Sequence, residues 1–240
     1  MMTTQQSRPL GDVVQNTAAA LRPSQDTELS GRSVTLIGLA TEHIEPFYTN
    51  LSGDEKAYLW DYLQDGPFKT LSDFQTWIQG AIASPEVIVY GIIPTDQPTT
   101  PDGAANVVGC ASYLSIDTDN RALELGVLYS PKLHGTTAGT EAMYLMARHA
   151  FDTLGYRRCE WRCDSLNAAS FKAALRFGFK FEGTCRKHRI VKGRNRDTAW
   201  FSMVDDDWLH AQLALRRWLD ASNFDGSGRQ LKKLEEFRET

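Results

Sequence analysis

The segment from Ser130 to Ala142 constrains the fold of this 240-residue chain more than any other part of it. It is rich in glycine and threonine, and it joins an apolar run over 122–129 to a helical pattern that continues to Leu154. A strand, a turn of small residues and a helix N-terminus together form a typical site for a phosphorylated ligand, because unpaired backbone N–H groups point at the anion there. The alternative is a loop that is packed only for helix entry and binds no ligand.

The residues that follow predict a second strand and helix. The run 157–164 is typical of a strand, and 165–177 is typical of a helix that Gly178 ends. A further strand begins at Phe179, directly after this helix. The sequence therefore predicts an alternation of strands and helices, which is the pattern of an α/β domain.

This order of elements resembles the Gcn5-related N-acetyltransferase (GNAT) family, and within it the branch of the ribosomal-protein-serine and microcin-immunity acetyltransferases. The resemblance runs from about Ser33 to Trp208. Its signatures occur in the family's order: Thr140-Glu141-Ala142-Met143-Tyr144-Leu145, Asn167-Ala168-Ala169-Ser170, Gly178-Phe179, Phe181-Glu182-Gly183 and the run from Lys192 to Ser202. The resemblance implies a GNAT fold, with helices flanking a mixed, centrally parallel sheet of about seven strands and a splayed coenzyme A cleft.

Hydrophobic patterning places the remaining elements. We expect further strands at 33–39, 87–93 and 106–116, and further helices at 41–51, 71–83 and 208–219. Thr41 can cap the first of these helices. The strand from Phe179 continues to Val191, turns over Lys192–Arg196 and returns over Thr198–Val204 as a hairpin.

Composition divides the chain into three parts. Residues 1–30 are polar and lack periodicity, which is typical of a disordered or loosely packed arm. Residues 31–222 hold the predicted N-acetyltransferase domain, and 223–240 form a charged tail. Three apolar residues of this tail have the spacing of a short helix that packs on a neighbour: Leu231, Leu234 and Phe237.

Charge and cysteine content narrow the function classes. A net charge of −4 argues against nucleic-acid binding, and no apolar run approaches the ~20 residues of a membrane span. Cys159 and Cys163 lie about 13 Å apart along the same face of a strand, too far for a disulfide. We therefore expect reduced thiols in a cytoplasmic monomer or homodimer, and the spacing of cysteine and histidine predicts no metal site.

The resemblance implies acetyl coenzyme A as the co-substrate. In the family, backbone N–H groups at the strand end, here Val127 and Leu128, hold the thioester. The pyrophosphate then lies on the following turn: His134, Gly135, Thr136, Thr137, Ala138, Gly139 and Thr140. Thr137 departs from the small residue usual there, but its hydroxyl can donate to phosphate. Asn167 corresponds to the family's pantetheine contact and can equally be the N-cap of its helix.

Two residues are candidates for proton transfer. Glu124 matches a position where many relatives keep a carboxylate base, and strand alternation turns its neighbours Leu123 and Leu125 away from it. We expect this isolation among apolar residues to raise its pKa, although a Glu paired with an Arg on the sheet is the alternative. Ser170 stands where this branch carries a hydroxyl that can protonate the thiolate, or it bonds only within its helix.

The acceptor side is less sharply defined. Trp60 and Tyr62 lie between the first two helices, where acceptor specificity usually resides in this fold, or they close the core. His188 lies on a strand near the acceptor side and can contact the substrate or remain a surface residue. A small or aminoacyl-type amine is the first acceptor we predict and a protein N-terminus the second. A non-catalytic coenzyme A-binding module is the contrasting class.

Overall fold

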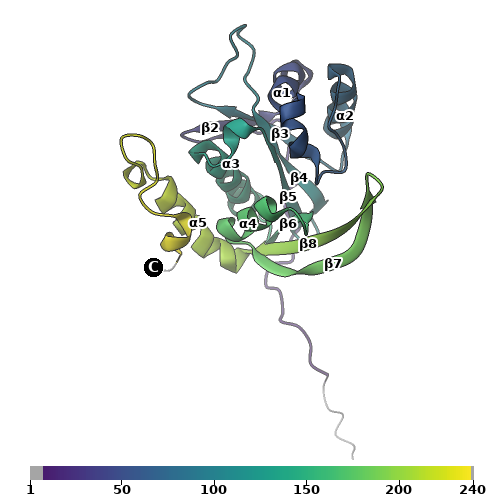
Figure 1. Cartoon of the computed structure of the whole chain (residues 1–240). Helices are drawn as coiled ribbons and strands as arrows, with labels where there is room; N and C mark the ends of the chain where they lie inside the picture. The colour runs from purple at the N-terminus through teal and green to yellow at the C-terminus, as the bar shows by residue number, and fades with distance from the viewer. Residues whose placement is uncertain (1–7, 239–240) are drawn as a thin grey trace, which may run out of the picture.

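Helices pack on both faces of one eight-stranded sheet in the computed structural model, which describes residues 8–238 (Figure 1). In sheet order the strands are β1 (Leu29–Ser30), β2 (Val34–Gly38), β3 (Ile88–Pro94), β4 (Gly109–Asp117), β5 (Ala122–Tyr129), β6 (Arg158–Asp164), β8 (Arg194–Val204) and β7 (Lys180–Val191). Neighbouring strands run antiparallel except β5 and β6, which run parallel at the centre. The predicted mixed sheet is confirmed, with the two-residue β1 added at its edge.

The helices form two layers, and each layer covers its own core. The helices are α1 (Ile44–Leu51), α2 (Leu71–Ala83), α3 (Thr137–Arg148), α4 (Ala168–Phe177) and α5 (Asp205–Leu219). One core lies between α1, α2 and the sheet, and includes Phe47, Phe74 and Val107. The larger core lies under α3, α4 and α5 on the opposite face. Side chains that alternate along a central strand therefore face one helix layer or the other.

The ends of α4 agree with the prediction from the sequence, whereas the starts of α1 and α5 differ from it. Asn167 caps α4 by accepting a hydrogen bond from the Ser170 N–H at 3.0 Å, and Gly178 ends that helix as predicted. The sequence predicts the first helix from Thr41, but residues 41–43 form a 3-10 turn and Thr41 caps nothing. Helix α5 begins at Asp205 instead of Trp208, because three aspartates in its first turn interact favourably with the helix dipole.

Strands β7 and β8 form a long hairpin that curls toward the segment before α2 (Figure 1). Its turn is Lys192–Gly193, shorter than the predicted 192–196, with φ angles of 49° and 73°. Two successive positive φ angles are typical of the type I′ turn that matches strand twist. The tip of the hairpin contacts the segment between α1 and α2, where Lys192 Nζ donates a hydrogen bond to the Trp60 carbonyl at 2.7 Å.

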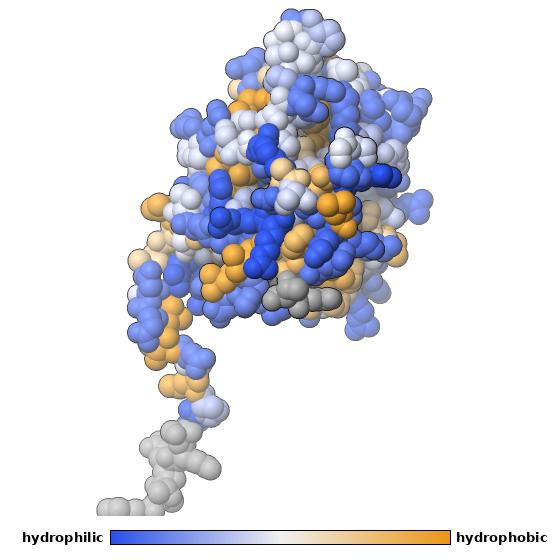
Figure 2. Space-filling model, turned by 90° about the vertical axis from the view of Figure 1, so that its left-hand side faces the viewer, coloured by the Kyte–Doolittle hydropathy of each residue, from blue (hydrophilic) through white to orange (hydrophobic). Residues whose placement is uncertain are grey.

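The N-terminal arm is shorter than the composition suggests. Residues 8–17 are exposed and project from the body of the molecule (Figure 2). Ala20 and Leu29, however, are buried in the larger core, and the Tyr90 hydroxyl donates to the Ser24 carbonyl at 2.6 Å. The boundary predicted at residue 30 is therefore too late, since packing begins near residue 18. The first seven residues of the predicted arm lie outside the described residues.

The C-terminal segment also packs on the domain. Leu234 is 1% exposed, and Leu234–Phe237 form one 3-10 turn beside α4 and α5. The predicted short helix includes Leu231, Leu234 and Phe237, but the structure has only this 3-10 turn, and Leu231 remains exposed. The last two residues of the predicted tail lie outside the described part of the chain.

Candidate active site

The central strands β5 and β6 stop pairing near the middle of the sheet. Their parallel register includes Ala122, Leu123 and Glu124, and within the described residues it goes no further. Beyond that point β5 remains bonded to β4, where Val127 pairs with Ala111 and Leu128 with Cys110. The edge of β5 that faces β6 thus carries backbone groups without a strand partner, beside the two residues predicted to hold the thioester.

The turn after β5 leads into α3 with unpaired donors at the helix start. Thr136 is the N-cap, and its hydroxyl accepts from the Gly139 N–H at 3.0 Å. The N–H groups of Thr137 and Ala138 bond to no other described residue. They remain available to an anion together with the positive end of the helix dipole. His134 lies exposed beside them.

Other residues of the turn hold its shape. Gly135 has a φ of +71°, in the left-handed region that favours glycine, and a Cβ there would meet no atom within 4 Å. Position 139 requires glycine because the backbone of Leu133 lies close to it, and a Cβ at 139 would lie 2.6 Å from the Leu133 carbonyl oxygen. Thr140 is buried, and its hydroxyl donates to the Thr136 carbonyl and accepts from Arg176 at 3.1 Å. Gly139 and Thr140 therefore use their polar groups inside the protein.

Asn167 and Ser170 lie at the start of α4 against the larger core. Asn167 Oδ1 caps the helix, so the N-cap role is realised, while its Nδ2 bonds to no described residue. Trp161 Nε1 donates to Ser170 Oγ at 3.0 Å. Trp161 belongs to β6 and is buried under α4, which places both residues on the α3–α4 side of the parting strands.

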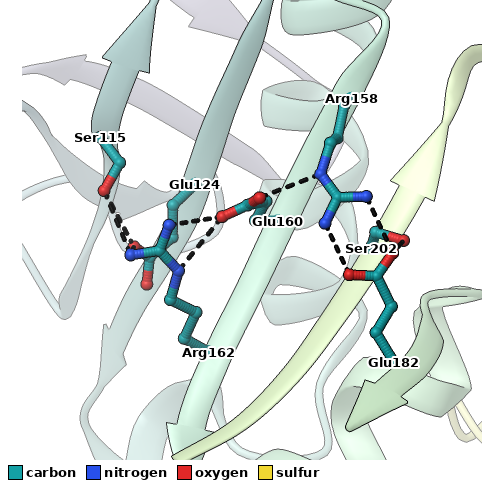
Figure 3. A network of polar contacts seen from close by, with 7 residues as sticks. All are labelled: Ser115, Glu124, Arg158, Glu160, Arg162, Glu182 and Ser202. Carbon is teal, nitrogen blue, oxygen red and sulfur yellow. Dashed lines mark hydrogen bonds and ion pairs between the residues drawn. The ribbon is translucent and has the colours of Figure 1, made fainter. Parts of the chain in front are cut away.

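Glu124 lies on the opposite face of the sheet, because Leu123 and Leu125 are buried in the α3–α5 core. It is not isolated among apolar residues as predicted. Arg162 Nη1 lies 3.3 Å from Glu124 Oε2, and the Ser115 hydroxyl donates to the same oxygen at 3.4 Å (Figure 3). The alternative, a Glu paired with an Arg on the sheet, is the one that the structure shows.

The pKa of Glu124 is nevertheless raised, in the predicted direction. Burial of the carboxyl is the largest cause, because it disfavours the charged form. Arg162 opposes this by its positive charge, and Glu160 on β6 reinforces it by its negative charge. A carboxyl at the point where β5 and β6 part thus has its pKa shifted toward the range that suits a general base.

A polar network extends from Glu124 across the sheet (Figure 3). Arg162 also pairs with Glu160, which is held from its other side by Arg158 at 2.9 Å. Arg158 also forms an ion pair with Glu182 on β7, with Arg158 Nη2 at 2.6 Å from Glu182 Oε2. Sequence reasoning missed this network, although its signal is present. Along β6 charged residues alternate with the buried apolar ones, at 158, 160, 162 and 164.

The predicted acceptor residues differ in exposure and contacts. Trp60 is 2% exposed and packs edge-on against Phe68 and Trp77, so it closes the core and offers no surface for stacking. Tyr62 is partly exposed, and its carbonyl oxygen accepts from Arg196 Nη1 at 3.5 Å. His188 is exposed on β7, with Nδ1 at 2.9 Å from Thr198 Oγ1. The hairpin and the 60–64 loop are thereby brought together on the face that carries Glu124.

The described residues lack the side-chain groupings of a metal site and the helices of a membrane span. Across 8–238, no three side chains of His, Cys, Asp or Glu lie close enough together to hold a metal ion. In the same part of the chain every helix is too short or too polar to cross a membrane. The cysteines at 110, 159, 163 and 185 are all free thiols.

Comparison with known proteins agrees with this fold. The model of the acetyltransferase (GNAT) domain matches residues 33–180, and the chain belongs to this family of acetyl-CoA-dependent N-acetyltransferases. A GCN5-related N-acetyltransferase structure from Brucella melitensis is 36% identical, with a TM-score of 0.88 over 95% of this chain and 100% of that one. A probable GNAT-family acetyltransferase from Chromobacterium violaceum is 37% identical, with a TM-score of 0.75 over 85% and 99% of the two chains.

Two further matches are more distant. One supports the fold alone, and the other aligns with only part of the chain. The microcin C7 self-immunity acetyltransferase MccE, solved with acetyl-CoA and AMP, is 21% identical, with a TM-score of 0.62 over 72% of this chain and 93% of its own. Among curated proteins, the uncharacterized N-acetyltransferase p20 of Bacillus licheniformis is 26% identical over 102 residues. That alignment spans 42% of this chain and 57% of the relative.

Proposed function

We propose that this chain transfers the acetyl group of acetyl-CoA to the primary amine of a small or aminoacyl-type compound by direct attack. The observation that carries the proposal is the parting of β5 and β6 at Glu124, a largely buried carboxyl with a raised pKa. Unpaired backbone groups of β5 and the free N–H groups of Thr137 and Ala138 lie along the same path. These groups suit a thioester arm that ends in a pyrophosphate.

The proposed reaction needs one group that accepts a proton and one that donates a proton, and the two lie on opposite faces of the sheet. The neutral amine nitrogen attacks the thioester carbonyl carbon, and the Val127 N–H, which points away from β4 on the edge of β5 that faces β6, stabilises the oxyanion that forms. Glu124 takes the amine proton through water on the α1–α2 side. The C–S bond then breaks, and Ser170 supplies a proton to the thiolate on the α3–α4 side. Proton uptake and proton donation therefore occur on opposite faces.

Direct attack is favoured over a covalent enzyme intermediate by the state of the thiols near this path. Burial raises the pKa of the Cys110 thiol to about 12, and it also raises the pKa values of Cys159 and Cys163. Protonated thiols are poor nucleophiles, because the thiolate is the reactive form. Glu124 acting on the incoming amine requires none of them.

A coupled assay tests the proposal. Release of the coenzyme A thiol is followed with a panel of primary amines and one short peptide, and mass spectrometry identifies the acetylated product. We expect amine-dependent thiol release and a product heavier by one acetyl group. Acetylation of the peptide alone would point to a protein N-terminus as the acceptor. Tight acetyl-CoA binding without transfer to any acceptor would identify a binding module and contradict the proposal.

A further inference from the structure

The β7–β8 hairpin concentrates positive charge in a chain whose net charge is −4. Between residues 184 and 197 there are six lysine and arginine residues against the single acid Asp197: Arg186, Lys187, Arg189, Lys192, Arg194 and Arg196. Within residues 8–238, none of the six forms an ion pair. Acidic side chains lie within electrostatic range of Lys192, Arg186 and Lys187, whereas the charges of the other three cations are available to an anion.

Two of these cations face the proposed acceptor site. Arg189 and Arg196 are direct partners in the hairpin register, so their side chains lie on one face of the hairpin. Both reach the loop that borders α2, where Arg189 Nη1 donates to Gln64 Oε1 at 3.2 Å and Arg196 Nη1 to the Tyr62 carbonyl. These partners are neutral. Neither of these two guanidinium groups forms an ion pair with a described residue.

The same face of β8 carries two buried donors without an acceptor. Arg196 Nε and Trp200 Nε1 are inaccessible, and neither has a hydrogen-bond partner among residues 8–238. Residues four apart on a strand share a face, and Trp200 pairs in register with Arg162, whose guanidinium lies 3.9 Å from the Trp200 ring centre. A buried donor without a partner destabilises the folded protein, because it has lost its hydrogen bonds to water and gained none in return. Donors of this kind are suited to a ligand that brings its own oxygen acceptors.

This face is continuous with Glu124. Arg162 contacts both the Glu124 carboxylate and the Trp200 ring. The positive charge of Arg189 also lowers the pKa of Glu124, so this one hairpin cation lies within electrostatic range of the carboxyl. A molecule with its amine at Glu124 can therefore extend toward Arg189 and Arg196.

We propose that the acceptor is a small amine that also carries an anionic oxygen group, a carboxylate or a phosphate, which Arg189 and Arg196 bind while its amine faces Glu124. This inference rests on the proposed acetyl transfer. Guanidinium groups bind carboxylate and phosphate through paired N–H donors. A polyamine, by contrast, would bring a second positive charge against these two arginines and is disfavoured.

Matched acceptors test the inference. Propylamine, β-alanine and 2-aminoethyl phosphate have similar skeletons with no anion, a carboxylate and a phosphate, and kcat/KM is measured for each with acetyl-CoA. We expect at least one anionic amine to exceed propylamine about tenfold or more, which corresponds to about 1.4 kcal/mol of recognition. The larger of the two values identifies the preferred anion. Equal kcat/KM for all three would overturn the inference and leave acetyl transfer intact.

Variants assign the preference to the hairpin. Arg196→Gln and Arg189→Gln should each raise KM for the anionic amine and bring its ratio to propylamine toward one. Trp200→Phe keeps an aromatic ring under Arg162 but removes the unpaired N–H, and it should reduce the same ratio more weakly. Arg186→Gln is the matched control, because Arg186 lies with Asn195 and Asp197 on the other side of the hairpin. A preference that survives Arg196→Gln and Arg189→Gln would contradict the assignment.

A binding measurement separates the two proposals if no amine is turned over. Absence of transfer to every acceptor would count against the proposed function. Thermal shift with the same three compounds, in the presence of coenzyme A, still decides the inference. Stabilisation by the anionic amines that is lost in Arg196→Gln supports it, and absence of stabilisation overturns it.

Discussion

At the scale of the residue, the chemistry depends on how each polar side chain is partnered. The alternation of β5 predicts which face Glu124 occupies, because Leu123 and Leu125 must be buried. The sequence does not predict its partner, since Arg162 reaches it only after β5 and β6 become neighbours in space. Trp60 shows the same limit. Its burial depends on Phe68 and Trp77, which approach it through packing that periodicity does not describe.

Replacing Glu124 tests the general base. Its pKa is raised, so the ionised base is lost as pH falls through a value above the ordinary glutamate range, and activity should decline on that acidic limb. Glu124→Gln should lower kcat about 100-fold or more, abolish the limb and leave acetyl-CoA affinity unchanged. The measurement is the pH profile of kcat.

Glu160→Gln is the matched control for this prediction. The negative charge of Glu160 contributes to the raised pKa of Glu124, and Glu160 also shares Arg162 with it. Neutralising Glu160 should therefore keep the acidic limb and move it to lower pH. A Glu124→Gln enzyme that retained the wild-type limb would place the base elsewhere, with His188 as the next candidate.

Replacing Ser170 tests whether its hydroxyl donates the proton that the thiolate takes up. If Ser170 protonates the thiolate, Ser170→Ala should slow the acetyl-transfer step by roughly 10–100-fold in a pre-steady-state measurement. The same change also removes the acceptor of Trp161 Nε1. Trp161→Phe removes that hydrogen bond while keeping the hydroxyl, and it should retain the wild-type step. A silent Ser170→Ala would mean that solvent protonates the thiolate, whose pKa near 8.5 makes it a good leaving group.

At the scale of the element, the sequence predicts most of what local forces determine. The predicted α2 matches the structure, and Asn167 and Gly178 bound α4 as expected. These features depend on periodicity, capping and turn geometry, which are local. The point where β5 and β6 part and the contact of the hairpin with the 60–64 loop are not local. Both features join residues that are far apart in sequence, and no pattern within either segment predicts them.

The turn before α3 provides the prediction at this scale. Gly135→Ala and Gly135→Glu share the same strain at a φ of +71°, and a Cβ there meets no neighbour. Only the glutamate brings a negative charge to the N–H groups of Thr137 and Ala138. We expect it to weaken acetyl-CoA binding at least tenfold relative to the alanine variant, about 1.4 kcal/mol by titration calorimetry. Equal affinities in two folded variants would rule this turn out as the pyrophosphate site.

At the scale of the whole molecule, the sheet places two distinct helix layers around one site. The α3–α4 layer carries the turn, Asn167 and Ser170, and the α1–α2 layer with the hairpin encloses the face of Glu124. The GNAT resemblance predicts a mixed sheet flanked by helices, but it does not predict how the candidate residues divide between the two layers. It does not predict that the arm contributes to the larger core, because the composition of residues 1–30 is that of an unpacked segment.

Truncation measures that contribution. Deleting residues through 17 removes only exposed chain in the described range and should leave the melting temperature unchanged. Deleting through 32 removes buried Leu29 and Ala20, together with the Ser24 carbonyl that accepts from Tyr90. Burying one leucine is worth about 1.5–3 kcal/mol, so the melting temperature should fall by at least roughly 5 °C. Equal melting temperatures for both truncations would show that the packed part of the arm stabilises nothing.

We propose that acetyl transfer takes place where β5 and β6 part, with Glu124 on the acceptor side. A crystal structure of the Glu124→Gln variant with acetyl-CoA tests it most directly. We predict the thioester carbonyl beside the backbone of Val127 and Leu128, the pyrophosphate on the N–H groups of Thr137 and Ala138, and the substituted side chain within one water molecule of the acetyl carbon. A thioester bound away from the edge of β5, or a substituted side chain that points away from the acetyl group, would contradict the account.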